Sequence, residues 1–408
     1  MVGCTGGGDG QRERHTVTDG GNNSISTLSI WSEKINGKGE DGPPLILLSD
    51  DYSFGVIAVS DGVGGAGSRQ VHVGGRLASG AKIAATNLLE VLLVFFKGAW
   101  LQTPPDGNTT ASLGVGTSPG AGKHQPSNQQ KPYVVAKVGG CSAYLLNGAV
   151  CGPSMAHHID VLSKTIDYAF EKMNREITEA QSPSRLKSKI LRNLPSTLAG
   201  WVYRTEPERE ITAFWAGDSR CYVLHADGLR QVSRDEAKGN YDSFEAIWAD
   251  PPLTNYISEK TPNCIQRKSL LCDNPAILIC ASDGAFNYLP TPMDFEFVVL
   301  SALNSSETMQ DWANKLAERL LAAAGDDVSI ILHPVGFSSF ENLKRNYKGR
   351  LEKLDGEFLG PIKALKDKEA QLERELASLK AVAKENTKEA WSRYRDTYDQ
   401  YLHDGDLL

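Results

Sequence analysis

The sequence lacks several features that would place it in a specialised class of protein. Basic residues are not in excess, with 43 Lys and Arg against 50 Asp and Glu, so no nucleic-acid partner is predicted. The seven cysteines include no C-x-x-C pair, which predicts neither a zinc site nor a disulfide framework. No signal peptide is recognisable near Met1. Together these absences predict a protein of a reducing compartment, the cytoplasm.

No hydrophobic run is long enough to predict a membrane span. The most apolar stretch, residues 88–96, is far shorter than the roughly 20 residues that a span needs. It also contains Glu90, so it predicts a buried helix. Hydrophobic residues make up 40% of the chain and charged residues 23%, which is typical of a globular protein and excludes a wholly disordered chain.

Composition divides the chain into three parts. Residues 1–26 are rich in Gly, Asp, Asn and Thr and are predicted to form a disordered N-terminus. Residues 27–335 are predicted to form one large domain, interrupted at 103–132 by a stretch of mostly Pro, Gly, Ser, Thr, Asn and Gln that predicts a flexible insertion. Residues 336–408 hold equal numbers of basic and acidic residues and are predicted to form a charged helical tail.

Apolar residues of this tail recur every three or four positions, which predicts helices. A first helix runs from Phe340 to Phe358, and Gly360-Pro361 interrupts it. The second helix fits the a and d positions of a coiled coil, with Glu369 at the one polar position, through Ile362, Leu365, Leu372, Leu376, Leu379 and Ala383. Trp391, Tyr394, Tyr398 and Tyr401 share one helix face, for which packing on the domain and a docking or self-association surface both remain open.

The large domain mixes short β-rich runs with longer helical ones. Helices are predicted at 71–96, 158–180 and 305–324, and strands at 54–59, 211–216, 221–225, 276–281 and 328–332. Because strands do not alternate one for one with helices, the pattern favours an α+β sandwich over a doubly wound parallel sheet.

Acidic residues lie where these β-rich runs meet loops. Asp61 and Asp283 each end such a run within a Ser-Asp-Gly sequence, and Asp326-Asp327 directly precedes another. A lone Asp-Gly is more often a hairpin turn, but a hairpin needs a second strand at once, and neither site has one. The repeated pattern therefore indicates one site assembled from several strands.

Carboxylates gathered at one place repel each other unless cations neutralise them. These acidic motifs provide oxygen ligands and no Cys or His ligand. Oxygen ligands predict hard cations, Mg²⁺ or Mn²⁺. Two such ions would polarise a phosphoryl group and lower the pKa of a water molecule.

In these blocks the chain resembles the metal-dependent protein phosphatases of the 2C type, and it is most similar to their divergent bacterial members. The matching blocks occur in the family's order: Glu40-Asp41, Asp61-Gly62-Val63-Gly64-Gly65, Gly217-Asp218-Ser219-Arg220, Ala281-Ser282-Asp283-Gly284 and Asp326-Asp327-Val328-Ser329. The resemblance spans 27–335 and implies two packed antiparallel β-sheets flanked by helix pairs. It implies a phosphoserine/phosphothreonine protein phosphatase whose attacking water or hydroxide is activated by two divalent metal ions.

The resemblance also assigns roles to single residues. Asp61 would bridge both metals, Gly62 would offer its backbone carbonyl, and Asp283 and Asp326 would complete the first metal's shell. Glu40 would act on the second metal through water, with Asp41 supporting it. The block 217–220 is expected to be a structural hairpin turn, and the segment 234–255 corresponds to the family's variable flap beside the active site.

Two departures from the family pattern concern the substrate. The Arg that usually precedes the Glu of the acidic pair by four residues is replaced by Asn36, with Lys34 and Lys38 near it in the sequence. Asn36 and Lys38 are the candidate substrate-binding residues. Val63 stands where many eukaryotic members carry a His. The expected partners are a phosphorylated protein and a cognate Ser/Thr kinase. Two alternatives stay open: an inactive or weakly active phosphatase-like module that recruits a partner through its tail, and a hydrolase of small phosphoesters.

Overall fold

The computed structural model describes residues 14–18, 26–49, 54–73, 76–101, 132–138, 141–146, 155–180, 193–204, 210–249, 251–260, 262–271 and 274–400. The chain divides into two compact units, residues 1–350 and 351–408. Most of the predicted insertion, residues 103–131, lies outside the described residues, and its last residue, Pro132, begins a strand.

Two antiparallel sheets form the centre of the first unit. The six-stranded sheet has the order β1 (Arg14–Thr18), β2 (Thr27–Ser32), β15 (Val328–Val335), β14 (Ala276–Ala281), β11 (Arg220–His225) and β12 (Gly228–Gln231). The five-stranded sheet has the order β13 (Gln266–Leu271), β10 (Glu210–Ala216), β9 (Leu198–Arg204), β4 (Phe54–Val59) and β3 (Leu45–Leu48). Two small ribbons accompany them, β5 (Gln70–Val73) with β6 (Arg76–Ser79) and β7 (Pro132–Val138) with β8 (Cys141–Leu146).

One hydrophobic core lies between the two large sheets. It joins Trp201 and Ala213 of the five-stranded sheet to Val223 and Leu278 of the six-stranded sheet. Trp201 Nε1 donates a hydrogen bond across this core to the carbonyl oxygen of Ile279 at 2.9 Å. Every residue of β14 is buried, because its small and branched apolar side chains fill both faces of a covered strand.

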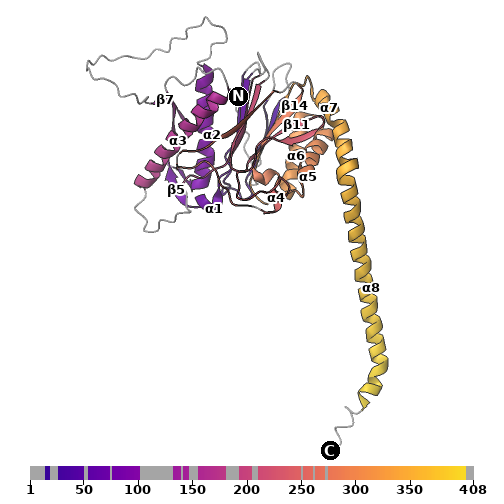
Figure 1. Ribbon diagram of the computed structural model, residues 1–408. Helices are drawn as coiled ribbons and strands as arrows, with labels where there is room; N and C mark the ends of the chain where they lie inside the picture. The colour runs from indigo at the N-terminus through magenta and orange to yellow at the C-terminus, as the bar shows by residue number, and fades with distance from the viewer. Residues whose placement is uncertain are drawn as a thin grey trace, which may run out of the picture. The chain divides into compact units, whose positions relative to one another are not determined.

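Helix pairs cover the outer faces of the sheets (Figure 1). α2 (Gly80–Leu101) and α3 (Met155–Ala180) build a second core against the five-stranded sheet. On the other side, α5 (Pro292–Asn304) packs on α6 (Met309–Ala323), and α6 contacts β1 and β2. The remaining short helices are α1 (Gly64–Gly67), α4 (Glu245–Ala249) and the 3₁₀ turn η1 (Asp283–Ala285). The predicted sandwich of two antiparallel sheets flanked by helix pairs is confirmed.

Two local predictions for the first unit are wrong. Residues 71–73 and 76–79 are not helical but belong to β5 and β6, which precede α2, and the consecutive glycines at 74 and 75 of the sequence disfavour a helix across this stretch. The N-terminus is not wholly disordered, because β1 pairs with β2 from Arg14 opposite Trp31 to Thr18 opposite Thr27. The rest of the predicted disordered segment, apart from Ser26, lies outside the described residues.

The predicted boundary between domain and tail at residue 336 is also wrong. α7 (Phe340–Lys353) buries Leu343 and Tyr347, and Tyr347 Oη donates to the carbonyl oxygen of Leu224 at 2.7 Å. Arg350 forms an ion pair with the buried Glu296 at 2.7 Å. The apolar stripe of α7 is therefore part of the first unit's core, and the division falls after Arg350.

The second unit is helical, as predicted. A π-helical turn, η2 (Leu354–Leu359), precedes α8 (Gly360–Tyr398), which has Pro361 in its first turn and no buried residue. Proline is well suited to the start of a helix because its missing N–H is not needed there. Within the described residues, no helix has both the length and the apolar character to cross a membrane.

Candidate functional site

Acidic side chains from separate parts of the chain line one cavity of the first unit, with a volume of about 660 Å³. Asp61 follows β4, Asp283 follows β14, and Asp326 precedes β15. Glu40 comes from the loop between β2 and β3, and Asp218 comes from the turn between β10 and β11. Each predicted metal ligand that would offer a side chain directly to the ions thus lies at the same cavity, and Gly62 lines it as well.

The backbone around Asp61 is fixed by the segment that leads into β9. The carbonyl oxygen of Asp61 accepts hydrogen bonds from Thr197 N at 2.7 Å and from Ser196 Oγ at 2.8 Å. Gly62 forms an isolated antiparallel bridge with Ser196. These bonds hold residues 61 and 62 in place at the end of β4, where both line the cavity.

Asp41 and Asp327 hold the surrounding loops. Asp41 is buried and accepts a hydrogen bond from Ser282 Oγ at 2.9 Å. Asp327 accepts from the backbone N–H of Lys34 at 2.8 Å and from that of Glu40. Asp41 is absent from the cavity lining, so its position agrees with the supporting role that the resemblance implies.

Burial and mutual repulsion raise the pKa values of these carboxyls. Burial is the largest cause for Asp61, whose pKa lies well above its usual range, and the charges of Asp41 and Asp283 raise it further. Burial raises the pKa of Asp41 to about 7, although hydrogen bonds to Asp61 and two serines oppose the shift. The pKa of Glu40 is also raised, mainly by burial. Without cations, this cluster therefore retains protons at a pH where exposed carboxyls are ionised.

Asp218 is a member of the site that the sequence reasoning missed. Burial raises its pKa to about 7, and the charge of Asp283 is the next cause. Gly217 enables the turn, because its φ of 96° is strained for any residue with a side chain. The available signal was an Asp at the second position after the buried strand β10, which is also where Asp61 and Asp283 lie after β4 and β14.

Arg220 of the same block has the expected structural role. Its guanidinium is buried and donates to Asp235 through Nε at 2.9 Å and Nη2 at 2.6 Å. Glu236, the next residue, accepts from Gly217 N at 3.1 Å, while Glu236 N donates to the carbonyl oxygen of Gly217 at 3.0 Å. Hydrogen bonds from the segment after β12 therefore hold the turn that carries Asp218 in place.

Gly64 lies against the carboxylate of Glu40. A Cβ atom at Gly64 would collide with Oε2 of Glu40. A side chain at this point of the Asp-Gly-x-Gly-Gly block would therefore displace the carboxylate of Glu40 from its present position.

The donor set suits a hard divalent cation, since its candidate ligands are oxygen atoms. Within the described parts of the chain, however, no three His, Cys, Asp or Glu side chains are arranged closely enough to hold an ion as they stand. The chemistry of the site thus fits Mg²⁺ or Mn²⁺, and its ion-binding geometry remains a prediction.

The two predicted substrate residues lie differently. Lys38 lines the cavity, together with Lys34 and Ile35 of the same loop, and Asn36 is not among the lining residues. Lys34 Nζ donates to the carbonyl oxygen of Gly325. Lys38 is therefore the better placed of the two candidates to approach an anion in the cavity.

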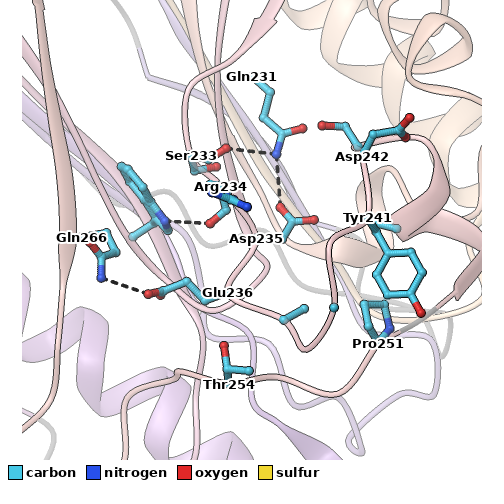
Figure 2. Close-up of a pocket in the computed structure, with 15 residues that line it drawn as sticks. Gln231, Ser233, Arg234, Asp235, Glu236, Tyr241, Asp242, Pro251, Thr254 and Gln266 are labelled. Carbon is cyan, nitrogen blue, oxygen red and sulfur yellow. Dashed lines mark hydrogen bonds between the residues drawn. The ribbon is translucent and has the colours of Figure 1, made fainter.

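A second cavity of the first unit, shown in Figure 2, has a volume of about 460 Å³. Pro251 lines both cavities, and most of the second is formed by residues 231–254. In Figure 2, Gln231 donates to Ser233 and Asp235 on one side of this cavity, and Tyr241 lies beside Pro251 on the other. The segment 234–255 thus lies beside the candidate site, as the flap prediction requires.

Comparisons with known proteins return phosphatases. No protein-family model matches the chain. A protein of Mycoplasma genitalium named as a candidate protein phosphatase is 26% identical over 136 residues, which are 30% of this chain and 50% of that protein. The chain thus spans about half the length of the curated relative that it matches.

Solved structures similar to the chain include a bacterial serine phosphatase, at a TM-score of 0.48 and 14% identity over 77% of this chain and 98% of that one. The serine/threonine phosphatase Stp1 of Staphylococcus aureus has a TM-score of 0.47 and 13% identity, and the similarity covers 83% of this chain and all of Stp1. For the Mycobacterium tuberculosis serine/threonine phosphatase PstP/Ppp, the TM-score is 0.44 at 13% identity over 75% of this chain and 96% of that one. The proteins that this chain is similar to therefore bear names from the class that its motifs resemble.

Proposed function

We propose that this protein is a phosphoserine/phosphothreonine protein phosphatase that uses two divalent cations, Mg²⁺ or Mn²⁺. The observation that carries the proposal is the gathering of six carboxylates around one cavity: Glu40, Asp61, Asp218, Asp283, Asp326 and Asp327. The first five of these side chains and the carbonyl of Gly62 would hold the ions. Bound ions would supply positive charge to the phosphoryl oxygens and lower the pKa of a water molecule.

The chain's own residues would prepare this site. Ser282 and Asp41 fix the loops around it through their hydrogen bond, and residues 196–197 fix the backbone of Asp61. Lys38 would attract the phosphate dianion to the cavity, and residues 241–253 would contact the polypeptide on either side of the phosphorylated residue. The three cysteines whose surroundings are described, Cys221, Cys264 and Cys280, are free thiols, which supports the proposed cytoplasmic location.

The direct test is Mn²⁺-dependent release of phosphate from a phosphothreonine peptide. We expect release with Mn²⁺ or Mg²⁺, none after chelation, and a higher kcat/KM for the peptide than for a small phosphoester such as p-nitrophenyl phosphate. If Mn²⁺ raises the melting temperature but no phosphate is released from either substrate, the protein is an inactive phosphatase-like module. Release from the small ester alone would identify a small-molecule hydrolase.

Lys38→Ala is expected to raise KM for the phosphopeptide by about twofold to fivefold, because an exposed charge contributes modestly to binding an anion. The effect should shrink at high salt, where exposed charges are screened. The matched control is Asn36→Ala in the same loop, which should leave KM unchanged because Asn36 is not part of the cavity lining. Steady-state kinetics at two salt concentrations distinguishes the residues, and a larger effect from Asn36→Ala would contradict this assignment.

The stability of the metal-free protein is expected to fall as pH rises. A carboxyl whose pKa is higher in the folded than in the unfolded protein favours folding while it is protonated. The pKa of Asp41 and that of Asp218 rise from 3.8 to about 7, so their contribution is complete below 3.8 and is lost as pH rises through about 7.

Melting temperatures at about pH 5.5 and about pH 8, with a chelator and with saturating Mg²⁺, measure this effect. We expect the chelated protein to melt at a lower temperature at the higher pH, and Mg²⁺ to remove the difference. Asp218→Asn should reduce the pH dependence of the chelated protein. A chelated protein that is equally stable at both pH values would contradict the carboxylate repulsion described above.

A further inference from the structure

Helix α8 carries an apolar stripe that nothing covers within its own unit. None of its 39 residues is buried, and Leu372 and Leu376 are 54% and 52% exposed. Five large side chains of this stripe recur at the a and d positions of a heptad repeat: Ile362, Leu365, Leu372, Leu376 and Leu379. A solvated surface helix normally has polar residues on its whole exposed face, so a stripe of this regularity indicates a helical partner.

We propose that the partner is α8 of a second copy of this chain, in an antiparallel two-stranded coiled coil. The two-fold axis would lie between Ala370 and Gln371. In this register Ile362 faces Leu379 of the second copy, and Leu365 faces Leu376 of the second copy. All five large apolar residues of each helix are then used, over a length of about 27 Å at 1.5 Å per residue.

The polar seam position decides the orientation. In a parallel pair, Glu369 would face Glu369 of the second copy at equivalent a positions, and two carboxylates would repel each other in the seam. In the antiparallel register, Glu369 faces Leu372 of the second copy, and its methylene groups can cover that leucine while its carboxylate reaches water. The antiparallel pair therefore avoids the contact between two Glu369 carboxylates that a parallel pair would contain.

The charges that flank the seam fix the register. In the proposed pair, Lys366 lies opposite Glu373 of the second copy, and Lys368 lies opposite Glu375 of the second copy. The two-fold axis repeats both pairs, which makes four complementary contacts. A slip of one heptad towards the C-terminus would instead place Glu373 and Glu375 each opposite its own copy, so repulsion opposes that slip.

The mass of the full chain in solution tests the association. Sedimentation over a range of concentrations should show a reversible monomer–dimer equilibrium, with a twofold change in mass. Leu372→Glu with Leu376→Glu should give a monomer throughout, with helix content retained because both sites are exposed and Glu favours helices. The matched control is Ala377→Glu with Ala381→Glu, at outer heptad positions, which should still dimerise. A parent chain that is monomeric at every concentration would overturn the proposal.

Cross-linking tests the orientation. Ile362→Cys with Leu379→Cys should form a disulfide-linked dimer beyond the level of the parent chain, while Leu379→Cys alone should not. Efficient cross-linking of the single variant would mean a parallel pair and overturn the proposal. The charges give a rescue experiment: Lys366→Glu with Lys368→Glu should weaken the dimer, and adding Glu373→Lys with Glu375→Lys should restore it.

Discussion

Asp61→Asn is expected to abolish metal-dependent phosphate release, with a loss in kcat/KM of about a hundredfold to a thousandfold or more. Burial raises the pKa of Asp61 well above its usual range, and the charges of Asp41 and Asp283 raise it further. Replacing it with the isosteric amide removes a charge that two ions would share, so both the affinity for the ions and their placement should suffer. Asp283→Asn should have an effect of the same order, because its side chain lines the same cavity.

Stability measurements separate this loss from misfolding. In the chelated protein, Asp61→Asn removes a buried, repelled carboxyl, so its melting temperature should equal or exceed that of the parent chain. The rise in melting temperature on adding Mn²⁺ should shrink. The control is Glu318→Gln, the same change from acid to amide at an exposed position of α6, which should alter neither activity nor the response to Mn²⁺. Full activity in Asp61→Asn would contradict the metal-site assignment.

The second large effect concerns the C-terminal boundary. A chain that ends at Gly336 lacks α7 and is expected to be unfolded or aggregated. The truncation exposes the surface that Leu343 and Tyr347 cover, and each large buried side chain contributes about 2–5 kcal/mol. It also leaves Glu296 buried without Arg350, at a further cost of about 3–5 kcal/mol. The sum approaches or exceeds the roughly 5–15 kcal/mol that stabilises a typical domain.

A chain that ends at Leu359 provides the comparison. It retains all of α7 and η2 and lacks only α8 and the residues after it. We expect it to unfold cooperatively near the melting temperature of the full chain and to keep its activity, measured by calorimetry and phosphate release. A chain ending at Gly336 that melts as the full chain does would show that α7 adds nothing to the core.

The sequence predicted the part of the site that local patterns encode. Asp61 and Asp283 follow buried strands within the same three-residue sequence, so the repeat predicted that they meet at one site, and they line one cavity although β4 and β14 belong to different sheets. Asp218 was assigned to a structural turn, because the same residues describe both a turn and a ligand, and only the fold shows that this turn opens on the cavity. Asn36 was placed by counting back from Glu40, and a count along a loop does not predict which side chains line a cavity.

The helices of the C-terminal region show that the sequence pattern also does not predict which surfaces pack together. The apolar residues of α7 and those of α8 repeat with nearly the same period, so both stripes predict amphipathic helices. Leu343 is buried in the first unit, whereas Leu372 is exposed. The period of the apolar residues predicts that a helix has an apolar face, but it does not predict which part of the protein covers that face. The helices were therefore correctly predicted, whereas the domain boundary at residue 336 was misplaced.

The hydrogen bonds of Asp235 and Glu236 to the block 217–220 couple the choice of polypeptide target to the position of the Asp218 carboxylate. Asp235 and Glu236 line the second cavity, yet they also hold the backbone that positions Asp218 at the first. A substitution there that adapts the protein to a new polypeptide would also displace a carboxylate at the reaction centre. Inherited variation in target preference should therefore concentrate at Tyr241, Asp242, Ser243 and Ala246, which also line the second cavity, and should be scarce at positions 235 and 236.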